Sequence, residues 1–142
     1  MIYIYCLFDP RTNVPFYVGA TNNTKIRLQQ HIAQAKKNRD KAIAFKTGAP
    51  FQLHYFPAIR KFLTICEILD SGNKPGLTVF CYTPKESIAS FYEKFYYLAL
   101  KSQGFDIQQE HNRFYPPNDR QFPLTTKKNT YLLEYPQNIF GN

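Results

Sequence analysis

Apolar and aromatic residues fill every position from 2 to 8, so alternate side chains would line the two faces of a strand. Both faces of that strand are therefore predicted to be covered. Residues 9–13 have the composition of a turn, and Phe16-Tyr17-Val18 predicts a second short strand. Residues 2–19 are thus predicted to form an antiparallel β-hairpin, with Gly19 letting the chain bend out of the sheet.

A helix is predicted from about residue 25 to residue 38. Several residues between 21 and 24 are candidates for its N-cap, and good helix formers follow them. At 100° per residue the apolar positions form one stripe, and Arg27 and His31 lie along the edge of that stripe. The stripe consists of Leu28, Ile32 and Ala35.

Residues 39–53 are predicted to form a loop, because Gly48-Ala49-Pro50 interrupts any regular element there. A second helix is predicted to begin near Pro57 and to end at Gly72. A third strand is predicted over residues 77–82. The second helix is expected to bury Ile59, Phe62, Leu63, Cys66 and Leu69.

A long helix is predicted after the third strand. Thr83-Pro84-Lys85-Glu86 has the pattern of a capping box with proline at the first helical position. The helix is expected to run to about Ser102 and to end at Gly104. Apolar residues cover most of its surface, so it is predicted to lie centrally in the fold.

The composition changes near residue 112, where Pro, Asn, Tyr and Phe become frequent and the prolines exclude long helices. We therefore predict a core domain over residues 1–110 and an irregular extension over residues 111–142 that packs on or beside it. The core is predicted to be α+β. It should contain a small three-stranded antiparallel sheet that includes the N-terminal hairpin, flanked by about three helices.

The chain of 142 residues has 18 Lys and Arg against 10 Asp and Glu, a net charge of +8. This excess favours an anionic partner such as nucleic acid. A merely soluble basic protein has the same composition, because the excess is spread along the chain. The 11 tyrosines and 13 phenylalanines suit both an aromatic core and stacking surfaces for bases.

The three cysteines are an odd number and lie in apolar surroundings, so they are predicted to be small core residues in a reducing, cytoplasmic setting. Residues 1–8 lack a basic region and are too short to cross a membrane, so a strand is predicted there and no membrane partner is expected. The cysteines are Cys6, Cys66 and Cys81.

Glu93 is a candidate functional residue because its helical neighbours are apolar or aromatic. Burying a carboxylate costs several kcal/mol unless a cation or donors compensate, so a metal ion or an arginine is expected beside it. A glutamate that reaches solvent or bonds a tyrosine also fits this pattern.

Arg27 and His31 are one turn apart, where a guanidinium can bind a phosphate and an imidazole can move a proton. An exposed basic edge has the same spacing. Tyr5 and Tyr17 lie on adjoining predicted strands and can point at one site, where a cation would make a phenol a better base. Two such tyrosines also suit simple packing.

The order and spacing of these residues resemble the GIY-YIG nuclease superfamily over roughly residues 2–108. The family pattern has a tyrosine on the first strand, a Tyr-hydrophobic-Gly on the second and an arginine, often with a histidine, on the first helix. A glutamate on a later helix and a closing asparagine follow. This chain departs from the pattern at Tyr3, where the family has glycine, and at Asp106, where it commonly has asparagine. The matching residues are Tyr5, Tyr17, Gly19, Arg27, His31 and Glu93, with Gly104-Phe105-Asp106-Ile107 at the closing position.

The resemblance implies a metal-dependent endonuclease that hydrolyses DNA, with Mg²⁺ or Mn²⁺ held by Glu93 and by other oxygen ligands that include water. It implies that Tyr5 acts as the general base or orients the attacking water, and that Tyr17 positions the nucleophile or Tyr5. Arg27 would stabilise the pentacovalent phosphate, and His31 would relay a proton or contact a phosphate. The supporting positions would be Gly19 and Asp106.

Two alternatives stay open at this point. The chain could be a catalytically inactive nucleic-acid-binding module, with activity lost through the changes at Tyr3 and Asp106. It could also be a protein-interaction domain that uses its aromatic surface. A nuclease with one active site is expected to nick DNA unless it forms a homodimer, and so small a core suggests a separate specificity partner or limited specificity.

Overall fold

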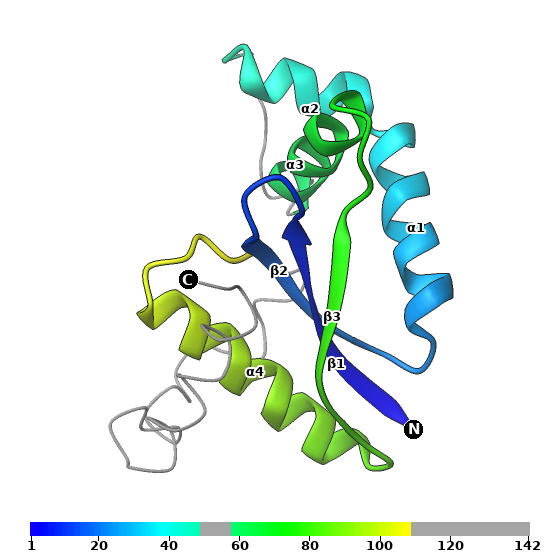
Figure 1. The fold of residues 1–142 in the computed structure, drawn as a ribbon, viewed down its shortest axis with the longest axis vertical. Coiled ribbons are helices and arrows are strands. Elements are labelled where there is room, and N and C mark those ends of the chain that lie inside the picture. The colour runs from blue at the N-terminus through cyan, green and yellow to red at the C-terminus, as the bar shows by residue number, and fades with distance from the viewer. Residues whose placement is uncertain (49–57, 109–142) are drawn as a thin grey trace.

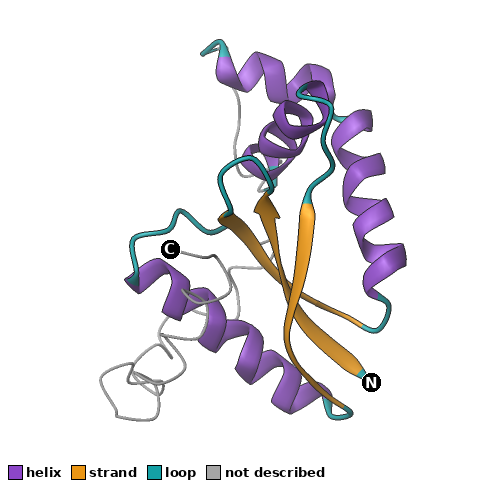
Figure 2. Cartoon of the chain, viewed as in Figure 1, coloured by secondary structure: helices purple, strands orange, loops and turns teal. Residues whose placement is uncertain are grey.

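The computed structural model describes residues 1–48 and 58–108. Over these residues the chain forms a three-stranded antiparallel sheet with helices on both of its faces (Figures 1 and 2). The predicted α+β class and three-stranded sheet are confirmed. The predicted extension over residues 111–142 lies outside the described residues. The elements are β1 (Ile2–Asp9), β2 (Val14–Thr21), α1 (Thr24–Lys37), α2 (Arg39–Lys46), α3 (Ile59–Asp70), β3 (Gly76–Thr83) and α4 (Glu86–Ser102).

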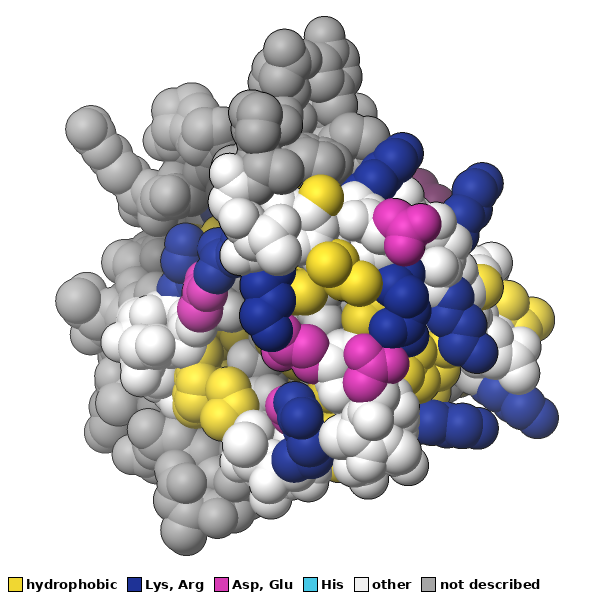
Figure 3. Space-filling model, turned by 90° about the horizontal axis from the view of Figure 1, so that it is seen from above, with side chains coloured by type: hydrophobic (Ala, Val, Ile, Leu, Met, Phe, Trp, Pro, Cys, Tyr) yellow, Lys and Arg dark blue, Asp and Glu magenta, His cyan; other side chains and the backbone are white. Residues whose placement is uncertain are grey.

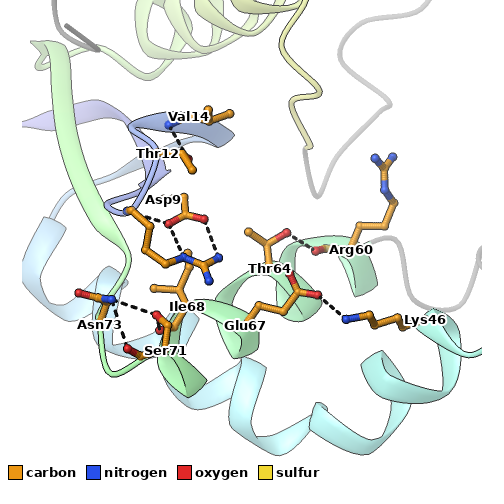
Figure 4. Close-up of polar contacts among 11 residues, drawn as sticks. Asp9, Thr12, Val14, Lys46, Arg60, Thr64, Glu67, Ile68, Ser71 and Asn73 are labelled. Carbon is orange, nitrogen blue, oxygen red and sulfur yellow. Dashed lines mark hydrogen bonds and ion pairs between the residues drawn. The ribbon is translucent and has the colours of Figure 1, made fainter.

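The central strand is β1, and the sheet order is β2-β1-β3. β1 and β2 form the predicted hairpin, whose turn is stabilised by the carboxylate of Asp9. This carboxylate accepts hydrogen bonds from the backbone nitrogen and the guanidinium of Arg11 (Figure 4). The same guanidinium lowers the pKa of Asp9 below its ordinary value. Asn13 adopts a left-handed φ of 58°, which asparagine tolerates better than most residues.

The two faces of β1 are covered by different helices. Ile4 and Cys6 belong to the core cluster that α4 completes. Tyr5 and Leu7 point the other way and belong to the cluster completed by α1 and α3. Figure 1 shows α4 on one side of the sheet and the other helices on the opposite side. The alternation predicted from residues 2–8 is confirmed.

The cysteines have the predicted structural role. Cys6 and Cys66 are buried, Cys81 is half-buried, and all three are free thiols. Burial raises the pKa of the Cys6 and Cys66 thiols, and it raises the pKa of Cys81 to about 11. They are therefore protonated near neutral pH and behave as small apolar side chains.

The loop predicted over residues 39–53 is wrong in its first half, because α2 occupies residues 39–46. α2 packs against α3, and two ion pairs join these helices. Arg39 pairs with Asp70 at 2.9 Å, and Lys46 pairs with Glu67 at 3.1 Å, the second of which is drawn in Figure 4. These partners are distant in sequence, so local periodicity could not reveal the helix.

The surface at the end of the molecule formed by α2 and α3 carries both acidic and basic side chains. Seen from above, acidic side chains lie between basic ones (Figure 3). On α2, Arg39 and Lys46 are paired with the carboxylates of Asp70 and Glu67. The net positive charge of the chain therefore does not form one continuous basic patch on this face.

The capping box predicted before α4 is wrong. Thr83 is still part of β3, where it pairs with Ile2, and α4 begins only at Glu86. The hydroxyl of Thr83 accepts a hydrogen bond from the backbone nitrogen of Lys85 at 3.3 Å, so it stabilises the turn before the helix. The predicted end is confirmed, because Gly104 takes a left-handed φ of 93° after the last turn.

Candidate active site

Tyr5 and His31 meet between the sheet and α1. The phenolic oxygen of Tyr5, on the central strand, lies 2.7 Å from Nε2 of His31. Both side chains are completely buried. His31 is therefore part of the apolar face of α1, and the alternative of an exposed basic edge is wrong at this residue. A hydrogen bond of this length in a dry environment fixes the position of the Tyr5 hydroxyl.

Tyr17 completes a group of three rings. Its ring centroid lies 4.9 Å from that of His31 in an edge-on arrangement and 6.1 Å from that of Tyr5. Tyr17 is 4% exposed and comes from β2, the neighbour of β1 in the sheet. Edge-to-face packing of this kind stabilises the group and restricts the rotation of each ring.

Lys61 is a member of this site that the sequence reasoning missed. It is completely buried on α3, and its Nζ lies 4.6 Å from the centroid of the Tyr17 ring. A desolvated ammonium above an aromatic face is held by a cation–π interaction. Lys61, Ile65 and Ile68 are buried at positions i, i+4 and i+7. The prediction for this helix was right for Ile59 and Cys66, which are buried, but Phe62, Leu63 and Leu69 are only half-buried, and Lys61 was not among the residues expected to be buried. Tyr5, Tyr17, His31 and Lys61 are called the Tyr5 cluster below.

Arg27 lies one turn before His31 on α1 and is half-buried. Its guanidinium donates a hydrogen bond to the side chain of Gln30 at 3.2 Å. Burial lowers the pKa of His31 from 6.5 to about 2, and the positive charges of Lys61 and Arg27 contribute to that shift. The imidazole is therefore neutral at physiological pH, with two cations close enough to act on it.

The second ring nitrogen of His31 distinguishes its two neutral forms. Nδ1 is buried and has no hydrogen-bond partner among the described residues. With the proton on Nε2, His31 donates to the oxygen of Tyr5; with the proton on Nδ1, Nε2 accepts from the Tyr5 hydroxyl. Because the pKa of His31 is so low, imidazole is a poor acceptor for a full proton transfer.

Position 19 needs a glycine because a side chain there would collide with the Tyr5 cluster. It lies opposite Tyr5 in the β1–β2 pairing. A Cβ at this position would be 2.8 Å from the phenolic oxygen of Tyr5 and 2.8 Å from the ring of Tyr17. The predicted bend at Gly19 is wrong, since β2 continues to Thr21. The glycine is needed for the close approach of two tyrosines rather than for a turn.

Gly19→Ala is expected to lower the free energy of unfolding by about 1–3 kcal/mol, because the added methyl displaces a fully buried phenol. Chemical denaturation of both proteins measures this loss. The Tyr5→Phe background is the matched control, since it lacks the hydroxyl that the methyl contacts. The penalty should be smaller in that background. An equal penalty in both backgrounds would show that contact with Tyr5 is not its cause.

Glu93 does not come from the same layer as the Tyr5 cluster. It is half-buried on α4, which packs on the opposite face of β1. Among the described residues no group of three or more His, Cys, Asp or Glu side chains is arranged to hold a metal. Glu93 itself contributes one carboxylate. Mg²⁺ commonly binds one or two carboxylates and keeps several waters, so this donor suits a hydrated ion.

Asp106 lies beside α3, where its carboxylate forms an ion pair with Arg60. The next residue, Ile107, is buried in the core, and the backbone nitrogen of Gln108 donates to the carbonyl of Phe16 at 2.9 Å. The segment after α4 therefore returns to the edge of β2 and reaches the side of the sheet that bears α3.

Comparison with known families bears on this arrangement. Residues 1–68 match the sequence model of the GIY-YIG catalytic domain. They contain the four residues of the Tyr5 cluster together with Gly19 and Arg27. Residues 1–68 are thus similar to the GIY-YIG catalytic domain. The family resemblance predicted from the sequence is confirmed over this part of the chain, and it supports a nuclease superfamily.

The GIY-YIG match ends before Glu93 and Asp106, so it says nothing of their roles. The search of curated proteins and the search of solved structures gave no match. None of the described helices has the length and apolar character needed to cross a bilayer.

Proposed function

We propose that this protein is an endonuclease of the GIY-YIG type that hydrolyses phosphodiester bonds in DNA, with Tyr5 at the reacting centre. The observation that supports this most strongly is the 2.7 Å contact between Tyr5 and a buried, neutral His31. A core histidine with only a packing role would not need two cations beside it, yet Lys61 and Arg27 both act on this one.

Tyr5 is the proposed general base. Positive charge close to a phenol favours its phenolate form, and the Tyr5 cluster contains one buried ammonium. The phenolate would take a proton from water, whose oxygen then attacks phosphorus. The bond to the leaving 3′ oxygen breaks, so the products carry a 5′-phosphate and a 3′-hydroxyl.

His31 is proposed as a positioning residue. A pKa of about 2 makes it a weak proton acceptor, so a relay through the imidazole is less favourable than donation of Nε2–H to the oxygen of Tyr5. That donation would hold the phenolate in place and spread its charge. Tyr17 supports the arrangement by packing its ring edge-on against His31 and beneath Lys61.

Arg27 is proposed to contact the substrate. Arg27 is half-buried, whereas Lys61 is completely buried, so Arg27 is the one of these two cations that a substrate can reach. Its planar guanidinium can donate hydrogen bonds to two phosphate oxygens at once. The charge on these oxygens increases as water adds to phosphorus, so a fixed cation stabilises the transition state more than the ground state.

Glu93 is the residue proposed to hold Mg²⁺ or Mn²⁺. When bound, the ion would supply Lewis acid chemistry by withdrawing charge from a phosphoryl oxygen. The chain contributes a half-buried carboxylate whose remaining partners would be water. The free thiols are consistent with a reducing compartment such as the cytoplasm. One active site per chain predicts nicking, and double-strand cleavage would need a homodimer or a partner.

The burial of Tyr5 favours one other candidate, a GIY-YIG module that binds nucleic acid without cutting it. In the described structure neither Tyr5 nor His31 has solvent-exposed surface. A base that never meets water would leave only the binding function. Salt-dependent DNA binding without cleavage under any metal would support this second candidate.

Arg27→Ala is expected to reduce the cleavage rate by about 100-fold while DNA affinity changes little, because the lost charge acts mainly on the transition state. The assay is conversion of supercoiled plasmid to nicked or linear DNA with Mg²⁺, Mn²⁺ or EDTA, beside a gel-shift measurement. Arg39→Ala is the matched control, since it removes the same charge from an arginine paired with Asp70. Equal losses in both variants would contradict a catalytic role for Arg27.

A further inference from the structure

Tyr3 and Tyr82 form an aromatic pair close to the Tyr5 cluster. They are direct cross-strand partners in the β1–β3 pairing, with ring centroids 5.9 Å apart and planes inclined by 49°. Tyr82 is 64% exposed and lies on an edge strand of the sheet. Neither ring belongs to the two core clusters, so this pair presents aromatic surface to solvent.

The pair lies on the same face of the sheet as Tyr5. Side chains at i and i+2 of a strand share a face and are roughly 7 Å apart, so Tyr3 is the neighbour of Tyr5 on that face. Tyr82 shares the face because it pairs directly with Tyr3. The start of β1 and the end of β3 lie together at the lower end of the sheet in Figure 1. The distance of roughly 7 Å between Tyr3 and Tyr5 is about twice the 3.4 Å rise per nucleotide of a DNA strand.

Two exposed lysines are close to the pair along the chain. Lys85, three residues after Tyr82, is exposed. Lys25, in the first turn of α1, is exposed as well and follows Thr21, which pairs with Tyr3 across the other edge of β1. Exposed aromatic rings and nearby basic residues together suit a ligand that carries both negative charge and flat rings, as a nucleic acid strand does. A purely structural role is the alternative, because two tyrosines that pack on each other across neighbouring strands stabilise a sheet. That role does not explain why most of the Tyr82 side chain is exposed to solvent.

We propose that Tyr3 and Tyr82 stack on an unpaired nucleobase of the DNA strand whose phosphate lies at Tyr5. This inference rests on the proposed nuclease function for the position of the phosphate. The stacked base would belong to a nucleotide one or two steps from the scissile bond. The Tyr3–Tyr82 pair, called the platform below, would therefore favour substrates with an unpaired base beside the scissile bond, such as single strands, flaps or distorted duplexes. It would have little preference for the identity of that base.

The first test uses Tyr82→Trp, which would give the chain its only tryptophan. Titration with a single-stranded oligonucleotide in EDTA, which prevents metal-dependent cleavage, should quench the indole emission, because a nucleobase stacked on the indole quenches it by direct contact. Phe91→Trp is the matched control, since Phe91 is similarly apolar and 43% exposed on α4, across the sheet. Its emission should not change. DNA binding in a gel shift without quenching of the Tyr82→Trp emission would overturn the platform.

The second test measures affinity with Tyr82→Ala and Tyr82→Phe. Loss of one stacking partner should weaken binding of a single strand about 10-fold, while phenylalanine keeps the aromatic face and the affinity. An abasic site at the stacked position should weaken wild-type binding and leave Tyr82→Ala unaffected. Equal losses for alanine and phenylalanine would overturn the stacking role.

Failure of this inference is separable from failure of the nuclease function. Cleavage by the wild type with no quenching and no penalty in Tyr82→Ala would overturn the platform alone. Quenching and a penalty without cleavage under any metal would retain the platform and overturn the nuclease. If the emission of Tyr82→Trp changed with protein concentration in the absence of DNA, the exposed edge of β3 would be a contact between two copies of the chain. That result would overturn the platform.

Discussion

Lowering the pH from 7 to 5 is expected to remove about 2 kcal/mol of folding stability through His31 alone. The pKa of this imidazole is 6.5 in its ordinary environment and about 2 in the folded protein. Below pH 6.5 the unfolded chain therefore binds a proton that the folded protein excludes, so the free energy of unfolding falls as the pH falls. Each pH unit below 6.5 costs about 1.4 kcal/mol until the folded pKa is reached.

His31→Gln is the variant that tests this pH dependence. Glutamine cannot titrate, so its stability should change less between pH 7 and pH 5 than that of the wild type, whatever it loses in packing at pH 7. Urea denaturation at pH 7, 6 and 5 measures both slopes, and the variant supplies the background from all other groups. Asp9 does not interfere, because its lowered pKa affects stability only below its ordinary value of 3.8. Parallel slopes would show that His31 is not held neutral by the fold.

The parts of the fold that the sequence predicts correctly are those that depend on local periodicity. Residues 2–8 alternate between two apolar faces, and the structure buries each face under its own helices. The stripe on α1 and the glycines that follow α3 and α4 are equally local signals. α2 was missed because it is held by packing against α3, with Ala42 buried between them, and a single sequence does not reveal contact with a helix that follows later in the chain.

The candidate site also contains some residues that the sequence predicts and one that depends on packing between distant elements. Tyr5, Tyr17, Arg27 and His31 were found because a family pattern fixes their order and spacing, and the structure brings these four together. Lys61 lies outside that pattern, and its position over Tyr17 depends on how α3 packs against the sheet. Likewise, the neutral state of His31 depends on burial and on the charges of Lys61 and Arg27. Packing between distant elements therefore determines the electrostatics of the site, although the sequence identifies most of its members.

Glu93→Gln is expected to abolish metal-stimulated cleavage. Glutamine keeps the size of the side chain and one oxygen, but it removes the negative charge that attracts a divalent cation. Loss of about 4 kcal/mol of transition-state stabilisation would slow cleavage about 1,000-fold. Supercoiled-plasmid conversion in Mg²⁺ and in EDTA measures the loss, and a gel shift should show that DNA is still bound.

The matched control for this prediction is Glu67→Gln on α3. It makes the same chemical change and the same change in net charge, but its carboxylate pairs with Lys46 at the surface, where such pairs contribute little to stability. Glu67→Gln should cleave as the wild type does. If Glu93→Gln also retained full activity, the metal would have to bind elsewhere. The placement of Glu93 on the helix across the sheet from Tyr5 would then have a structural reason only.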